Sequence, residues 1–393
     1  MPAPSVLFID LGTWEAFNAL AGALRKQRIG VRRISVPGHD ASHRAYRILE
    51  RLLYGPTQIL PAELDEARTM HLLTSSGIAA VSDSSPPIDV QAPDGVAHAM
   101  LLADPEAKRA MRRSRADFDQ RHLYEKPSMT DLAPSLGVVV AHPLSAPVNT
   151  FPVVVKASVG SGGQQVRVVH TQSEFDKAVA ELTTGAGDPP MIQEYHGGGL
   201  LQVGAIAVDG ELLVAVAYTS RTPPDDPQGP AVAVTAVDRP DVLEATKTLA
   251  KAVGSWGFLC LDFVLDSSGN AYFIDFNPRA FGSWPALQAL GADFVGCYLY
   301  LLGRGPRPER QSPRYGRTQR LLKFPADDRS WATLRTWSKE SALVVARSGR
   351  TLGWRWSAIS AARIIVGTGT ASVSVVKRRL SAGRVVSAAP VSR

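Results

Sequence analysis

Two aspartates within residues 257–283 have the spacing expected of a divalent-cation site. The segment GFLCLDFVLDSSGNAYFIDFNPRAFGS has an apolar run on each side of the turn signal DSSG, which predicts a β-hairpin. With the turn centred on residues 268–269, Asp262 lies directly opposite Asp275. Carboxylates that face each other across two strands repel, and a cation between them removes that penalty.

The alternation of side chains along the two strands supports this register. It predicts one uniformly apolar face, made of Phe263, Leu265, Tyr272, Ile274 and Phe276. The other face then carries Asp262, Asp275, Asn277 and Arg279. Two carboxylates and an amide oxygen are hard ligands that suit Mg²⁺ or Mn²⁺ better than zinc. The alternative is a hairpin whose polar face is merely solvated. That alternative does not explain why an acid, an amide and a guanidinium follow one another at every second residue, as Asp275, Asn277 and Arg279 do.

A second group of residues could bind phosphates. In FPVVVKASVGSGGQQVRVV, residues 151–169, Lys156 ends an apolar strand and Gly160, Ser161, Gly162 and Gly163 follow. Such a loop lets backbone N–H groups approach phosphates closely, and the lysine adds a point charge. Because GxxxxGK[ST] is absent, this is not a Walker A loop, and an ordinary glycine-rich hairpin turn is the alternative.

The elements around these groups predict an α/β fold. Strands at residues 5–10, 31–36 and 78–83 alternate with helices at 14–27 and 62–75, which favours a parallel sheet. A helical segment over 105–137 leads to the hairpin of 151–169, a helix at 172–182 and a strand ending at QEY, residues 193–195. The Pro- and Arg-rich residues 303–317 indicate a linker or an exposed loop.

Charge is unevenly distributed along the 393 residues. Residues 304–393 hold 19 Lys and Arg against 4 Asp and Glu, whereas the remaining 303 residues hold 24 against 32. A basic C-terminal quarter suggests contact with a polyanion, a membrane surface or an acidic partner, and a solvated basic tail is the alternative. Two cysteines, no signal peptide and no long apolar stretch favour a cytoplasmic location.

The order and spacing of these motifs resemble the ATP-grasp superfamily of carboxylate–amine ligases, including the D-alanine–D-alanine ligase and carbamoyl-phosphate synthase types. The lysine with its glycine loop, the QEY segment and the paired acids before NPR occur together over residues 121–303. The resemblance implies a pre-ATP-grasp domain (1–104), a helical linker (105–150), a small lid subdomain (151–196), a large antiparallel subdomain with the metal site (197–303) and a basic extension (304–393).

The same resemblance implies a role for each matching residue. The residues that bind ATP would be Lys126, Lys156, Ser158, Gly160, Ser161, Gly162, Gly163, Gln193, Glu194 and Tyr195. Asp262, Asp275 and Asn277 would bind two Mg²⁺ ions, for which Mn²⁺ substitutes. The catalytic residues would be Lys156, which reaches the α- and β-phosphates, and Arg279 and Arg221, which act near the transferred phosphoryl group or the carboxylate.

The sequence departs from the family pattern at two positions. The second metal ligand is usually Glu, and the shorter Asp275 stands here. The acid that often binds the ribose is replaced by Leu201, for which the neighbouring Gln202 is a candidate substitute.

The expected function is an ATP-dependent ligase that joins a small-molecule carboxylate to an amine, without specific nucleic-acid binding. A homodimer is the state that the resemblance implies. One alternative is an ATP-grasp enzyme with a thiol, bicarbonate or hydroxyl acceptor. Another is a non-catalytic nucleotide-binding scaffold with a membrane- or polyanion-binding tail.

Overall fold

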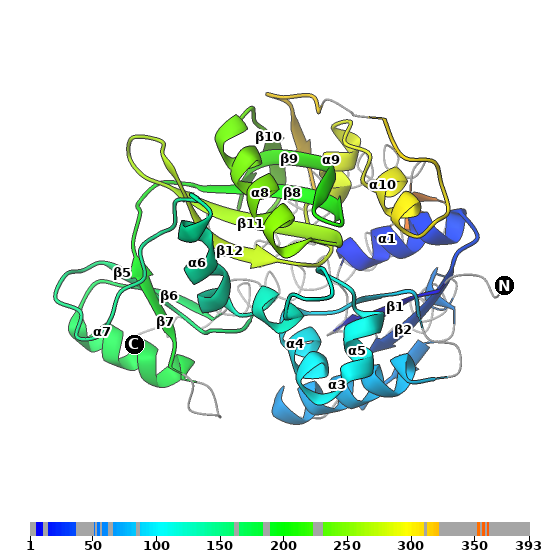
Figure 1. Cartoon of the computed structure of the whole chain (residues 1–393), viewed down its shortest axis with the longest axis horizontal. Coiled ribbons are helices and arrows are strands. Elements are labelled where there is room, and N and C mark those ends of the chain that lie inside the picture. Colours follow the sequence, from blue (N-terminus) through cyan, green and yellow to red (C-terminus); the bar gives the residue numbers. More distant parts are fainter. Residues whose placement is uncertain are drawn as a thin grey trace, which may run out of the picture.

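The computed structural model describes residues 5–10, 15–36, 51, 53–55, 57–61, 66–83, 87–160, 165–183, 189–222, 231–309, 313–321, 352–353, 356–357 and 360. These residues form three sheets: a four-stranded parallel sheet, a six-stranded antiparallel sheet and a three-stranded antiparallel sheet (Figure 1). The mixed α/β class and the division into parallel and antiparallel sheets agree with the prediction. No helix in these ranges combines the length and apolar character that a membrane span requires.

The N-terminal sheet has the strand order β3-β2-β1-β4. Its strands are β1 (Ser5–Asp10), β2 (Gly30–Ser35), β3 (Thr57–Ile59) and β4 (Asp89–Gln91), and all pairs are parallel. Helix α1 (Glu15–Lys26) joins β1 to β2, and α4 (Asp94–Ala103) follows β4. The carboxyl ends of β1 and β4 therefore lie at one edge of the sheet, and α4 begins there.

One predicted strand is wrong. Residues 78–83 are not a strand, because α3 (Glu66–Val81) continues through most of them. Leu73, Gly77 and Val81 are its buried positions, four residues apart, which is helical spacing. A short apolar run does not distinguish a strand from a buried helix turn, and the strand that completes the sheet is β4 instead.

The six-stranded sheet has the order β12-β11-β8-β9-β10-β13. Its strands are β8 (Leu200–Val208), β9 (Glu211–Arg221), β10 (Ala233–Ala236), β11 (Gly257–Leu265), β12 (Ala271–Asn277) and β13 (Thr318–Arg320). Helix α8 (Pro240–Val253) covers one face, and α9 (Trp284–Ala289) and α10 (Phe294–Leu301) cover the other. Both faces are therefore buried over most of their length.

The three-stranded sheet is a small separate layer, seen at the left of Figure 1. Strand β5 (Val153–Lys156) pairs with β6 (Val166–Val169) as the predicted hairpin and with β7 (Met191–Glu194) on its other side. Helix α7 (Gln172–Leu182) closes its core through Phe175, Ala178 and Leu182. The predicted helical linker consists of α5 (Pro105–Ala110), the 3₁₀ turn η1 (Gln120–Leu123) and α6 (Lys126–Ser135).

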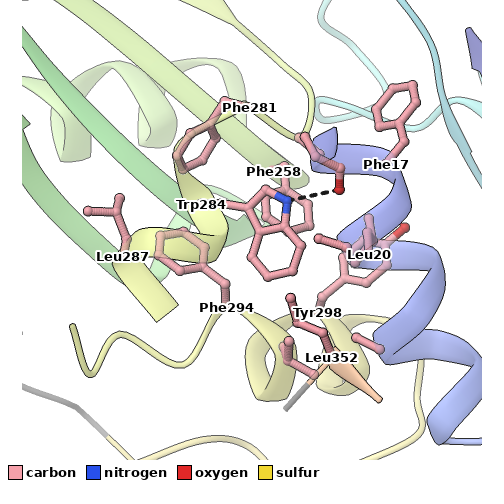
Figure 2. Close-up of a cluster of buried hydrophobic side chains, with 14 of the residues drawn as sticks. Phe17, Leu20, Phe258, Phe281, Trp284, Leu287, Phe294, Tyr298 and Leu352 are labelled. Carbon is pink, nitrogen blue, oxygen red and sulfur yellow. Dashed lines mark hydrogen bonds between the residues drawn. The ribbon is translucent and has the colours of Figure 1, made fainter. Parts of the chain in front are cut away.

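An aromatic core joins the N-terminal sheet to the six-stranded sheet (Figure 2). Trp284 of α9 is fully buried, and its indole N–H donates to the carbonyl of Ala16 in α1 at 3.1 Å. Phe258 packs against Trp284, and Phe294 and Tyr298 pack against Phe258. Burial of this many aromatic side chains fixes α1 against the six-stranded sheet.

Part of the basic segment 304–393 belongs to this body. Strand β13 pairs with β10, and Leu352, Trp356 and Ser360 are buried. The contact with α1 is close at Gly22, where an added Cβ would lie 2.5 Å from Trp356 Cβ and 2.6 Å from the Leu352 carbonyl oxygen.

Candidate active site

The hairpin of β11 and β12 places Asp262 opposite Asp275, which confirms the predicted pairing. The turn itself differs from the prediction. Asp266 and Asn270 close a three-residue loop in which Gly269 has a φ of +84°. A β-bulge after Asp262, with Ile274 as the extra residue, then shifts the register by one and restores the facing pair.

The bulge makes the predicted apolar face wrong at two positions. Phe273, not Ile274 as the predicted register requires, lies opposite Phe263, and Phe273 is fully buried in the core cluster that includes residues of α6 and α8. Tyr272 instead shares the aspartate face, where its ring stacks on His196 with centroids 4.1 Å apart. Ile274, as the bulged residue, is outside the alternation.

Asp262 is held by amide groups. Its Oδ1 accepts a hydrogen bond from Gln202 Nε2 at 2.7 Å, and its Oδ2 accepts one from Asn277 Nδ2 at 3.2 Å. Ser220 Oγ donates to Gln202 Oε1 at 2.7 Å, which turns the Gln202 amide nitrogen toward the carboxylate. Burial, and then the charge of Asp275, raises the pKa of Asp262 to about 6.

Asp275 has a cationic partner. Lys126 Nζ donates to its two carboxylate oxygens at 2.9 and 3.1 Å, and donates also to the carbonyl of Gly160 at 2.9 Å. Burial alone would raise the pKa of Asp275, but the ammonium groups of Lys126 and Lys156 outweigh it and lower that pKa below its ordinary value. Lys126 therefore links a predicted metal ligand to the loop after β5.

Lys156 reaches the same hairpin from the small sheet. Its side chain is almost fully buried, and Nζ donates to the carbonyl of Ile274, the bulged residue, at 2.6 Å. Burial lowers the pKa of Lys156 to about 8, and the nearby charge of Lys126 acts in the same direction. The two predicted phosphate-binding lysines thus converge on β12.

Arg279 and Asn277 extend the site toward the N-terminal domain. Arg279 Nε lies 2.9 Å from each carboxylate oxygen of Asp94 in α4, and Nη2 donates to Asn277 Oδ1 at 3.3 Å. Both partners of this ion pair are buried, with side chains 10% and 5% exposed. In this arrangement the guanidinium of Arg279 is bound by protein groups, and the carbonyl oxygen of Asn277 is turned toward it.

Gln193, Glu194 and Tyr195, which were predicted to bind ATP, lie at the end of β7. Gln193 is buried and its Nε2 donates to the carbonyl of Ala141 at 2.9 Å, while the Glu194 N–H donates to the carbonyl of His142 at 3.0 Å. Tyr195 is 40% exposed. The segment 139–144 that supplies those carbonyls also pairs with Phe273 of β12, so one extended stretch ties the small sheet to the large one.

The other predicted residues are placed less centrally. The Ser158 carbonyl accepts from the backbone N–H of Lys126 at 2.9 Å, whereas its hydroxyl donates to Pro189. Arg221 is exposed at the end of β9. Because Ser220 contacts Gln202 on the aspartate face, strand alternation starts the Arg221 side chain on the opposite face. Ser161, Gly162 and Gly163 lie outside the described residues, so their role stays a prediction.

Three residues of the site were not predicted: Asp94, His98 and Glu125. Asp94 binds Arg279, and His98, one turn later on α4, contacts Glu125 at 3.0 Å. Glu125 directly precedes Lys126. These contacts join residues far apart in sequence, and no local motif marks them.

The donor chemistry fits a hard divalent cation. Two facing carboxylates are ligands that Mg²⁺ prefers, and the raised pKa of Asp262 marks a negative charge that a cation would stabilise. The Asn277 oxygen accepts from Arg279 here, so the amide would have to turn to offer it to a metal. In the part of the chain that the structure describes, no three His, Cys, Asp or Glu side chains form a metal-binding group. A metal here would therefore depend on Asn277 and on bound phosphates as further ligands.

Comparison with known proteins agrees with this geometry. Residues 139–283 match the family model of the ATP-grasp domain. The carbamoyl phosphate synthase large chain of Clostridium beijerinckii is 29% identical over 146 residues, which is 35% of this chain and 14% of that protein. That of Clostridium botulinum strain Eklund 17B is 30% identical over 160 residues, with the same two coverages. The match thus spans about one seventh of these relatives.

Solved structures share the fold over a longer part of the chain. The biotin carboxylase domain of Hydrogenobacter thermophilus 2-oxoglutarate carboxylase, a complex with MgADP and bicarbonate, has a TM-score of 0.61 and 14% identity, covering 80% of this chain and 73% of that one. N5-carboxyaminoimidazole synthetase from Staphylococcus aureus has a TM-score of 0.53 and 12% identity, covering 79% and 80%. Residues 139–283 thus carry an ATP-grasp domain, and the fold of the chain is similar to that of solved ATP-grasp structures.

Proposed function

We propose that the protein is an Mg²⁺-dependent ligase that uses ATP to activate a carboxylate as an acyl phosphate and then joins it to an amine. The observation that carries the proposal is the pair of facing carboxylates, Asp262 and Asp275, with Lys126 and Lys156 directed at the same strand. Opposed acids beside two lysines suit a site that binds a metal–polyphosphate complex.

In this proposal Asp262, Asp275 and Asn277 hold two Mg²⁺ ions, for which Mn²⁺ substitutes. Bound Mg²⁺ would neutralise phosphate charge and orient the γ-phosphate. Lys126 now neutralises Asp275, so its ammonium would leave that carboxylate and turn toward the nucleotide phosphates. This exchange keeps Asp275 paired with a cation in both states.

The other residues proposed to contact the nucleotide lie in the small sheet, in the loop after β5 and in β8. Lys156, Ser158 and Gly160–Gly163 would surround the phosphates, with the loop excluding water from the acyl phosphate. Gln193, Glu194 and Tyr195 would border the adenine, and Gln202 would bind the ribose. Gln202 already donates to Asp262, so ribose binding would have to use its other hydrogen-bonding capacity.

The reaction proposed has two steps. A carboxylate oxygen of the substrate attacks the γ-phosphorus as the bond to ADP breaks, and the amine then attacks the acyl carbon and expels phosphate, losing a proton to solvent. Lys156 and Arg279 would stabilise the negative charge that develops on the transferred group. Arg279 Nε would stay on Asp94 while its Nη groups, now on Asn277 and the Ala280 carbonyl, turn toward that group. Arg221 would join them by turning from the opposite face of the sheet. No protein nucleophile is needed.

The nature of the acceptor separates this proposal from its nearest alternative. An ATP-grasp enzyme that uses a thiol, bicarbonate or hydroxyl acceptor would share the first step and differ only in the product. Mass spectrometry of the product distinguishes these outcomes. A non-catalytic scaffold is disfavoured by the complete set of Asp262, Asp275, Asn277 and Arg279.

A screen for ADP release against amino acids and small carboxylates tests the proposal. Once a substrate is found, Asp275→Ala combined with Asn277→Ala should abolish ADP release while circular dichroism shows a folded protein. ADP release at the wild-type rate by that variant would contradict the metal assignment.

A peripheral membrane or polyanion contact through the basic C-terminus is part of the proposal, as are a cytoplasmic location and a homodimer. Residues 361–393 contain six Lys and Arg and no Asp or Glu. A chain ending after Ser360 tests the contact, since a cut after Gly303 would also remove β13, Leu352 and Trp356 from the folded body. Equal sedimentation of both chains with phosphatidylserine vesicles would contradict the contact.

A further inference from the structure

Helix α4 of the N-terminal domain directs two polar side chains at the ATP-grasp site. Asp94 is its first residue and His98 lies one turn later, so both side chains share a face of the helix. Asp94 binds the guanidinium of Arg279, 185 positions along the chain. The site's arginine is thus held by a carboxylate from a different domain.

The second side chain acts near the other end of the site. His98 Nε2 lies 3.0 Å from Glu125 Oε1, and Ser128 Oγ donates to Glu125 Oε2 at 2.8 Å. Glu125 immediately precedes α6, whose first residue is Lys126. Fixing the carboxylate of Glu125 fixes the backbone from which Lys126 extends to Asp275 and Gly160.

We propose that α4 sets the positions of two cations of the site, with Asp94 as the positioning residue for Arg279 and His98 as the positioning residue for Lys126. This inference rests on the proposed function, in which Lys126 turns toward the nucleotide phosphates and Arg279 acts on the transferred γ-phosphoryl group, and it takes the phosphates that Lys126 contacts to be those that ADP also carries. Neither Asp94 nor His98 touches the nucleotide in this account. Each acts through its partner, so loss of each should affect a different part of ATP.

That difference separates positioning from plain domain stabilisation. Loss of His98 should weaken binding of both MgADP and a non-hydrolysable MgATP analogue, because both carry the phosphates that Lys126 contacts. Loss of Asp94 should weaken the analogue selectively, because only the analogue carries a γ-phosphate. A merely structural role would lower the affinity for both ligands equally.

The test uses the full-length protein and isothermal titration calorimetry with MgADP and with magnesium adenylyl-imidodiphosphate. We expect His98→Ala to weaken both about tenfold, and His98→Gln to restore both, because the amide N–H can donate to Glu125. We expect Asp94→Asn to weaken the imidodiphosphate about tenfold and to leave the affinity for ADP within about twofold of wild type.

Asp10→Asn is the matched control. Asp10 is buried and binds Arg33 and Ser35 of β2, whereas Asp89 is connected through Gln91 to the backbone next to Arg279. Asp10→Asn should lower the melting temperature, as we expect of Asp94→Asn, and leave both affinities unchanged. Wild-type affinities in Asp94→Asn and His98→Ala, or equal losses in Asp10→Asn, would overturn the inference alone. Failure of the wild-type protein to bind either nucleotide would overturn the proposed function and this inference with it.

Discussion

Asp262 and Asp275 lie directly opposite each other on β11 and β12, yet their pKa values shift in opposite directions. Asp262 receives hydrogen bonds from amides, and burial raises its pKa to about 6. Asp275 binds Lys126, and the two lysines lower its pKa despite burial. One acid is therefore neutralised by protein and the other retains a charge that the fold does not fully compensate.

This asymmetry predicts opposite effects of two similar substitutions on the metal-free protein. Near pH 8, ionised Asp262 destabilises the fold, because burial raises its pKa to about 6, well above the ordinary value for aspartate, which is equivalent to about 3 kcal/mol. We expect Asp262→Asn to raise the free energy of unfolding by about 1 kcal/mol. Removal of the buried charge stabilises the fold, and loss of the hydrogen bond from Asn277, which the new amide nitrogen cannot accept, offsets part of that gain. Asp275→Asn should lower it by about 3 kcal/mol, because it leaves Lys126 buried without its carboxylate.

Urea unfolding of both variants in the presence of EDTA measures the two changes. Wild type in the same buffer is the reference. A destabilised Asp262→Asn together with an unchanged Asp275→Asn would show that the charges are distributed differently from the structure.

The raised pKa of Asp262 also predicts how metal binding depends on pH. A metal binds the ionised carboxylate, so affinity should be nearly constant above pH 7 and should fall about tenfold per unit below about pH 6. Electron paramagnetic resonance of Mn²⁺ with the wild-type protein measures this fall. An affinity that is the same at pH 5 and pH 7 would argue against Asp262 as a ligand.

Lys156 predicts a change at the alkaline side. Because burial lowers its pKa to about 8, the free protein loses this ammonium as the pH rises through 8. Binding of MgADP should then weaken about tenfold for each unit above pH 8, since the bound phosphates favour the charged form. Lys156→Arg keeps its charge and should show a flat profile, even if its affinity is lower throughout. Parallel profiles for the two proteins would remove Lys156 from the phosphate site.

The contact between α1 and the C-terminal segment gives a prediction on stability. Gly22→Ala would place Cβ 2.5 Å from Trp356, so the segment must move and the free energy of unfolding should fall by about 1–3 kcal/mol. Gly305→Ala is the control, because its nearest neighbour, Leu299, would lie 3.6 Å away. Thermal unfolding followed by tryptophan fluorescence compares the two, and equal melting temperatures would mean that Trp356 does not pack at Gly22.

The facing aspartates could be predicted from sequence because strand alternation is a local property. The predicted pairing was correct although the turn was assigned the wrong length, since the bulge at Ile274 offsets the difference. The same bulge moved Tyr272 out of the expected apolar face and put Phe273 in it, because no sequence signal marks where a bulge falls.

The contacts of α4 could not be predicted. Asp94 and Arg279 are brought together by the packing of α4 against the segment after β12, and neither residue lies in a motif that indicates the other. The mistaken strand at 78–83 has a related cause, since its apolar residues fit either a strand or the end of α3 and the helix before them decides.

The proposed function depends on Asp262 and Asp275 together binding a divalent cation carried by a nucleotide. Crystals grown with Mn²⁺ and adenylyl-imidodiphosphate test this directly through the anomalous signal of manganese. We expect an anomalous peak in contact with both carboxylates, and Lys126 Nζ moved from Asp275 to the phosphates. A bound nucleotide with no manganese at these two aspartates, and Lys126 still paired with Asp275, would contradict it.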